Sequence, residues 1–123
     1  MIHPNEKRRH PRVRDRLTLR SSSPEAGSVD MSTINLSLGG VQVITQRYLP
    51  LMTRVEVTLH LPPEAGRESG PVPVKSEAVV VRIQPAHPTP ESRSFEMALF
   101  FSRMEQRDRS VLSRYLSTHS SEK

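Results

Sequence analysis

The strict alternation of apolar and polar residues from Arg54 to Leu61 is the feature that most limits how this chain can fold. Side chains of a β-strand point alternately to the two faces of a sheet, so the pattern predicts a strand with one buried and one solvated face. The buried face would carry Val55, Val57, Leu59 and Leu61. Because one strand cannot bury such a face alone, the chain must contain partner strands.

Further apolar runs predict these partners, and they are separated by segments rich in proline, glycine and serine. The predicted strands span residues 13–20, 29–34, 41–45, 72–83 and 95–101. Residues 21–28 are interpreted as a turn-rich break. In the run 72–83, the side chains predicted to share one face are Val79, Val81 and Ile83, and burial of Val80 on the other face is left open. Three aromatic residues are predicted to lie in the core, namely Phe95, Phe100 and Phe101.

The periodicity changes from strand-like to helical after residue 101. Ser102 and Glu105 fit a capping box, in which two side chains satisfy free amides at the start of a helix. An apolar stripe at helical spacing follows, formed by Val111, Leu112, Tyr115 and Leu116. Six short strands closed by one helix predict a mainly β fold, a small antiparallel six-stranded β-barrel with a C-terminal α-helix. The expected divisions are an arm at 1–16, the barrel and helix at 17–117, and a frayed tail at 118–123.

A chain of 123 residues suits one small domain, and an aromatic content of 4% requires a mostly aliphatic core. The absence of cysteine excludes disulfides and thiolate metal sites, and it suits a reducing compartment. No run approaches the roughly 20 apolar residues of a membrane helix, and the first residues lack the apolar core of a secretory signal. We therefore expect a cytoplasmic protein without membrane insertion.

The net charge of +5 is concentrated near the amino terminus. Residues 1–20 carry seven Lys and Arg against two acidic residues, whereas the remainder carries eleven of each sign. Pro4 and Pro11 disfavour a helix there, so an extended, flexible basic arm is predicted for residues 1–16. A cationic arm on a neutral body suits an anionic ligand better than a broad nucleic-acid interface.

Two short motifs carry residues suited to such a ligand. Arg8 and Arg12 form Arg-x-x-x-Arg, and a guanidinium can bind phosphate or the O6/N7 edge of guanine with two parallel hydrogen bonds. Four residues of extended chain span up to ~14 Å, so the two arginines can reach different parts of one ligand. The second motif is Asn-x-Ser-x-x-Gly, formed by Asn35, Ser37 and Gly40.

The second motif offers an amide, a hydroxyl and a bare backbone. The Asn35 amide and the Ser37 hydroxyl can each donate and accept hydrogen bonds. Gly40 lacks a β-carbon, so its backbone can approach a ligand or adopt a positive φ, and Gly39 adds freedom at the same turn. The same residue types also favour an ordinary turn between strands, so this motif alone is a weak signal.

Taken in order, the two motifs resemble the signature of the PilZ domain family. The resemblance implies a six-stranded barrel, often with a trailing helix, and a receptor for the bacterial second messenger cyclic di-GMP. The residues it implies for ligand binding are Arg8, Arg9, Arg12, Asn35, Ser37, Gly39 and Gly40. Many members carry aspartate at the position of Asn35, and asparagine avoids a negative charge beside the ligand phosphates.

The resemblance also implies a non-catalytic protein without cofactors that couples ligand binding to an unidentified effector protein, in the regulation of motility or exopolysaccharide. The number of bound ligand molecules, one or a stacked pair, stays open. The oligomeric state, monomer or homodimer, stays open as well. The five histidines are dispersed, so no metal site is predicted, and no group of residues suggests an activated nucleophile. Arg82 is predicted to face solvent, although it would reach a ligand from the barrel wall.

Two alternatives use the same features. The basic arm would also suit binding to DNA or RNA, although no recognition helix is apparent and the rest of the chain is neutral. The second alternative is a protein-interaction adaptor that works without a ligand. Competition between cyclic di-GMP and nucleic acid separates the first from the leading hypothesis, and stabilisation by the ligand separates the second.

Overall fold

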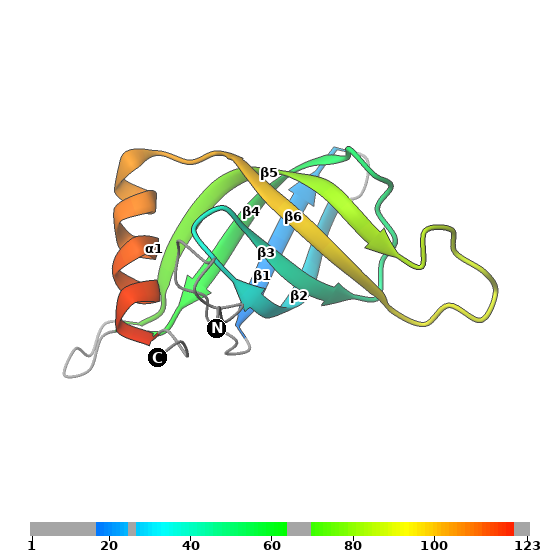
Figure 1. The fold of residues 1–123 in the computed structure, drawn as a ribbon, viewed down its shortest axis with the longest axis horizontal. Helices are drawn as coiled ribbons and strands as arrows, with labels where there is room; N and C mark the ends of the chain where they lie inside the picture. Colours follow the sequence, from blue (N-terminus) through cyan, green and yellow to red (C-terminus); the bar gives the residue numbers. More distant parts are fainter. Residues whose placement is uncertain (1–16, 25–26, 64–69, 120–123) are drawn as a thin grey trace, which may run out of the picture.

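The computed structural model describes residues 17–24, 27–63 and 70–119, and in this part six antiparallel strands close into a barrel with one helix (Figure 1). The elements are β1 (Thr18–Ser23), β2 (Gly27–Leu36), β3 (Gly40–Thr45), β4 (Arg54–Leu61), β5 (Val72–Gln84), β6 (Phe95–Arg103) and α1 (Gln106–His119). Around the barrel the strands follow the order β1-β2-β3-β6-β5-β4, and β4 pairs with β1 to close it. The predicted fold class is confirmed. The predicted basic arm lies outside the described residues.

Alternate side chains of every strand fill the barrel, as the periodicity predicts. All four apolar side chains of β4 are buried, at 4% exposure or less. The helix lies across one end of the barrel in Figure 1, next to β5, and its stripe of Leu112, Tyr115 and Leu116 joins the same core. A buried side chain of this size contributes about 1.5–3 kcal/mol, so the helix is an integral part of the domain.

The structure corrects the expected break at residues 21–28. Ser21 and Ser23 belong to β1 and are buried, and β2 already begins at Gly27. The Ser21 hydroxyl donates to the carbonyl oxygen of Val29 at 3.5 Å, so its burial leaves no free donor. Serine alternates here like an apolar residue because its small side chain fits inside the barrel and finds a backbone acceptor.

The predicted capping box is wrong. Ser102 lies in β6 and is exposed, and the helix begins at Gln106. The first helical bond runs from the Arg109 amide to the Glu105 carbonyl, at 2.9 Å. Strand pairing overrides the local preference: β6 continues to Arg103, opposite Glu77 of the long strand β5. The helix ends at His119, slightly beyond the predicted boundary at 117.

In the described part of the chain, no helix is long and apolar enough to cross a membrane. Among the same residues, no group of three or more His, Asp or Glu side chains is arranged to hold a metal ion. The predicted cytoplasmic location stays a prediction.

Candidate functional site

The residues of the Asn-x-Ser-x-x-Gly motif lie where β2 turns into β3. The Ser37 amide donates to the carbonyl oxygen of Gly40 at 2.9 Å, and the Ser37 hydroxyl donates to the same oxygen at 3.3 Å. These two bonds close a tight connection between the strands. Ser37 therefore holds the turn, and the lone pairs of its half-buried hydroxyl stay available as acceptors.

Gly40 is required by the packing of β3 against β6. A β-carbon at Gly40 would overlap the backbone carbonyl of Leu99, whereas one at Gly39 would meet nothing within 4 Å. The positive φ considered for Gly40 is not found; among the described glycines, Gly27 alone has one, at +67°. The Gly39 carbonyl accepts a hydrogen bond from the Phe101 amide at 3.0 Å, which fixes the turn to β6.

A β-bulge in β2 turns Asn35 out of the barrel. Thr33 pairs with Val43 and Asn35 pairs with Gln42, which leaves Ile34 as the extra residue. Val29, Met31 and Thr33 point inward, and after the bulge Leu36 does so. Strict alternation would have placed Asn35 in the core, because a bulge shifts the side-chain parity of its strand.

A second bulge, in β5, does the same for Arg82. Val80 pairs with Leu99 and Arg82 pairs with Ala98, which leaves Val81 as the extra residue. Val80 and Ile83 are buried, whereas Val81 is 50% exposed. The predicted common face of Val79, Val81 and Ile83 is therefore wrong, since the bulge breaks the alternation between Val80 and Ile83. Arg82 points outward at a position that regular pairing would bury.

The two bulges align these residues in one row across four strands. Asn35 pairs with Gln42, Gln42 pairs with Ala98, and Ala98 pairs with Arg82. Three inter-strand steps give the row a length of ~14 Å. It forms the floor of an open cleft of about 370 Å³ on the outside of the barrel. The cleft is lined by Asn35, Ser37, Gly39, Gly40, Val41, Gln42, Val81, Arg82, Ala98, Leu99 and Phe100.

Among the described residues, the lining of the cleft contains one cation and no carboxylate. Within the described residues, the Arg82 guanidinium has neither a hydrogen-bond partner nor an ion pair. Asn35 and Gln42 add two half-buried carboxamides, which can donate and accept. Such a surface favours an anionic ligand with polar edges.

Phe100 is a cleft residue that sequence reasoning assigned to the core. Phe100 is 52% exposed, whereas Phe95 and Phe101 are buried as predicted. The alternation of β6 contained the signal, because Phe95, Met97, Leu99 and Phe101 share the inward parity and Phe100 has the other. Because Phe100 and Phe101 are adjacent and both aromatic, both were assigned to the core although neighbouring strand residues point to opposite faces.

The predicted arginines Arg8, Arg9 and Arg12 lie outside the described residues. The described chain begins at Leu17, whose amide donates to the Thr33 hydroxyl at 2.9 Å and whose carbonyl accepts from the Thr33 amide at 3.0 Å. Leu17, five residues after Arg12, is thus fixed to Thr33 of β2, two residues from Asn35. The second motif and Arg82 share the cleft, and the position of the first motif stays a prediction.

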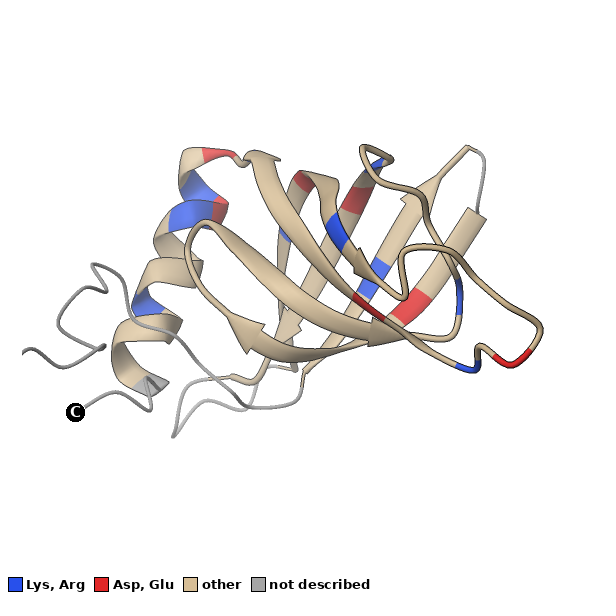
Figure 2. Ribbon diagram, turned by 45° about the vertical axis from the view of Figure 1, so that its right-hand side comes forward, with Lys and Arg blue, Asp and Glu red and all other residues tan. Residues whose placement is uncertain are grey.

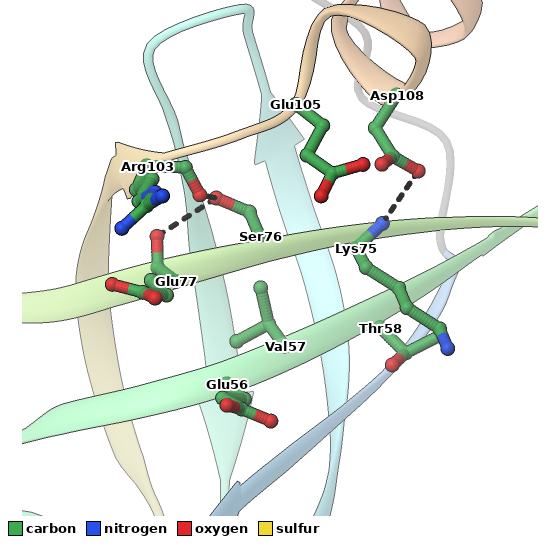
Figure 3. Close-up of a pocket in the computed structure, with 9 residues that line it drawn as sticks. All are labelled: Glu56, Val57, Thr58, Lys75, Ser76, Glu77, Arg103, Glu105 and Asp108. Carbon is green, nitrogen blue, oxygen red and sulfur yellow. Dashed lines mark hydrogen bonds between the residues drawn. The ribbon is translucent and has the colours of Figure 1, made fainter.

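A second hollow of about 510 Å³ lies between β4, β5 and the start of α1, and it is acidic (Figure 3). Its charged lining residues are Glu56, Glu77, Glu105, Asp108, Lys75 and Arg103. The Asp108 carboxylate accepts from the Lys75 amide at 3.1 Å, and the Ser76 hydroxyl contacts the Arg103 carbonyl oxygen at 3.0 Å. Along the described strands and helix, residues of both charge signs are interspersed (Figure 2).

A family model described as the PilZ domain matches residues 6–118. Among solved structures, the inhibitor of motility MotI/DgrA of Bacillus subtilis is similar with a TM-score of 0.71 at 24% identity, over 91% of this chain and 50% of that one. The PilZ domain of Escherichia coli YcgR with c-di-GMP has a TM-score of 0.63 at 13% identity, over 92% of this chain and 91% of that one. The structure of Escherichia coli YcgR in complex with c-di-GMP has a TM-score of 0.64 at 15% identity, over 91% of this chain and 45% of that one. No curated protein sequence matched. The chain thus spans about half of MotI/DgrA and of the longer YcgR chain.

Proposed function

The chain belongs to the PilZ domain family, and on this premise we propose that it is a receptor for cyclic di-GMP whose site is the cleft across β2, β3, β6 and β5. One observation carries the proposal. The motif residues Asn35, Ser37 and Gly40 share a cleft with an arginine that has no partner in the described part of the chain, and no carboxylate of that part lines the cleft. A dinucleotide with two phosphates and two guanines matches these groups in charge and in hydrogen bonding.

The arm arginines supply the remaining cationic contacts in this proposal. Arg12 precedes Leu17 by five residues and Arg8 precedes it by nine. In extended chain, Arg12 can therefore lie up to ~17 Å, and Arg8 up to ~31 Å, from Leu17. Both lengths exceed the ~14 Å row of the cleft floor. Arg8, Arg9 and Arg12 are therefore long enough in reach to meet a ligand that rests on Asn35 and Arg82.

The receptor works without catalysis and passes its signal to a partner protein. Ligand binding would favour the arm conformations that cover the cleft, and an effector would recognise the resulting surface. Two of the similar structures are an inhibitor of motility and YcgR in complex with c-di-GMP. We therefore place motility before exopolysaccharide as the process to examine. A cytoplasmic location fits a receptor for an internal messenger.

Calorimetric titration with cyclic di-GMP tests the proposal. Wild-type protein should bind, and Arg8→Ala or Arg12→Ala should each lose about 1–3 kcal/mol, or roughly tenfold to more than a hundredfold in affinity. Arg109→Ala is the matched control, because it removes one exposed charge on α1, away from the cleft lining. Binding should weaken with added salt.

Two results would overturn the assignment. Wild type that does not bind the dinucleotide contradicts the receptor function. Equal affinity in wild type and both arm variants contradicts the assigned site. Mobility-shift titration with DNA and RNA, in the presence of competing cyclic di-GMP, tests the alternative: nucleic-acid binding that the dinucleotide does not displace would favour a nucleic-acid-binding arm.

A further inference from the structure

The outward position of Arg82 depends on an irregularity in strand pairing. The bulge at Val81 interrupts the ladder between β5 and β6 and leaves a valine 50% exposed. Regular pairing would have kept the chain in register and placed residue 82 in the core. The bulge instead brings a guanidinium to the outer surface, beside Ala98, where no described residue binds it. Bulges of this kind commonly redirect one side chain towards a site.

The surroundings of Arg82 suit a planar base. Val81 and Phe100, both about half exposed, line the same cleft, and Ala98 offers only a methyl group beside the arginine. Apolar side chains of this kind cover the face of an aromatic ring, and they give nothing to a hydrated phosphate. No second cation of the described chain lines the cleft, so a phosphate would meet a single guanidinium there.

The edge of guanine matches the guanidinium itself. Guanine presents two acceptors, O6 and N7, to the parallel N–H donors of arginine. Adenine keeps N7 but carries an amino donor in place of O6, so the same fork meets a donor and loses one bond. At the other end of the row, Asn35 and Gln42 are carboxamides, which bind either base by exchanging donor and acceptor.

We propose that Arg82 reads the O6/N7 edge of a guanine and thereby gives the cleft its preference for guanine over adenine. The inference rests on the proposed receptor function and deepens it. It divides the work between two parts of the chain: the arm arginines supply affinity for the phosphates of any cyclic dinucleotide, and the barrel wall selects the base.

The experiment compares cyclic di-GMP with cyclic di-AMP, which has the same sugars and phosphates. Calorimetry on the full chain should show that Arg82→Ala lowers the preference for the guanine dinucleotide by roughly tenfold or more, mostly through weaker binding of cyclic di-GMP. Arg82→Lys keeps the charge without the fork, so it should also lose preference. Arg109→Ala should leave the ratio unchanged. Because Arg82 is exposed, all three variants should melt close to the wild-type temperature.

The outcomes separate the inference from the function. If wild type binds neither dinucleotide, the receptor proposal itself fails. If wild type binds cyclic di-GMP and Arg82→Ala keeps the wild-type ratio, the receptor stands and the assignment of Arg82 is wrong. An equal loss for both dinucleotides would mean that Arg82 contacts a phosphate, which also overturns the inference. Full retention of preference in Arg82→Lys would exclude recognition by the fork.

Discussion

The cleft across β2, β3, β6 and β5 and the acidic hollow beside α1 are both open surfaces of one small barrel, and they differ in charge. The hollow is larger, about 510 Å³ against 370 Å³, but the described residues that line it carry four carboxylates against two cations (Figure 3). From the described residues, the cleft receives one guanidinium and no carboxylate. For a ligand with two phosphates, the sign of the lining charge outweighs the available volume.

The two surfaces also differ in what their hydrogen-bonded groups hold together. In the hollow, Asp108 accepts a backbone hydrogen bond from Lys75, and Ser76 contacts the carbonyl oxygen of Arg103. In the cleft, Arg82 has no partner among the described residues. Asp108 and Ser76 thus join β5 to α1 and to β6, whereas no described residue binds the Arg82 guanidinium.

The largest expected effect concerns how the cleft is built. Gly40→Ala should destabilise the protein by about 1–3 kcal/mol, because the new β-carbon overlaps the backbone of Leu99 and must push β3 from β6. Gly39→Ala, one residue away, should change stability by no more than about 0.5 kcal/mol, since its β-carbon meets open space. Urea unfolding measures both. Equal stability of the two variants would show that β3 does not depend on this close approach.

The second effect tests charge directly. Gln42→Glu changes the shape of the cleft little but places a carboxylate on its floor. At about 10 Å from a phosphate and an effective dielectric constant of about 20, that charge opposes binding by about 1.7 kcal/mol, more than tenfold in Kd.

The matched control removes a carboxylate from the other surface. Glu105→Gln, in the acidic hollow, should leave the affinity for cyclic di-GMP within about twofold, because its charge is exposed and screened by salt. Calorimetry on both variants provides the comparison. A stronger response to Glu105→Gln than to Gln42→Glu would place the ligand near α1.

The smallest effect is expected at a site that belongs to neither surface. Arg20 donates to Asp30 at 2.8 Å between β1 and β2, and this hydrogen bond together with the positive charge lowers the pKa of the Asp30 carboxyl. A lowered folded-state pKa stabilises the protein above the ordinary aspartate pKa of about 3.9, and that contribution is lost as the pH falls through the lower folded value.

Because both side chains are about 60% exposed, water screens the pair. Asp30→Asn should therefore shift the melting temperature only slightly at neutral pH and leave ligand affinity unchanged. The small difference from wild type should disappear in acid. A large shift at neutral pH, or one that grows as the pH falls, would contradict this interpretation.

Sequence reasoning succeeded where periodicity and fold agree. The alternation in β4 fixed its bounds and its buried face, and the stripe of Leu112, Tyr115 and Leu116 fixed the inner face of α1. It failed where strand pairing overrides local pattern. The bulges at Ile34 and Val81 reverse which face of the sheet the following side chains point to, and no residue type at these positions predicts a bulge. The capping box at Ser102 failed because β6 continues in register with β5.

The candidate site was predictable only in part for the same reason. Asn35, Ser37, Gly39 and Gly40 were named from a motif and do line one cleft. Phe100 was assigned to the core and Arg82 to bulk solvent, because their place in the cleft depends on the parity of β6 and on the bulge in β5. Arg8, Arg9 and Arg12 stay predictions.

The most direct test of the account is the set of backbone amide shifts that cyclic di-GMP induces in ¹⁵N-labelled protein. A ligand in the cleft should cause the largest changes on its four strands, at Gly39, Gly40, Gln42, Arg82 and Ala98. Glu105 and Asp108 in the acidic hollow should change little. Shifts concentrated around Lys75 and α1, with the cleft residues unchanged, would contradict it.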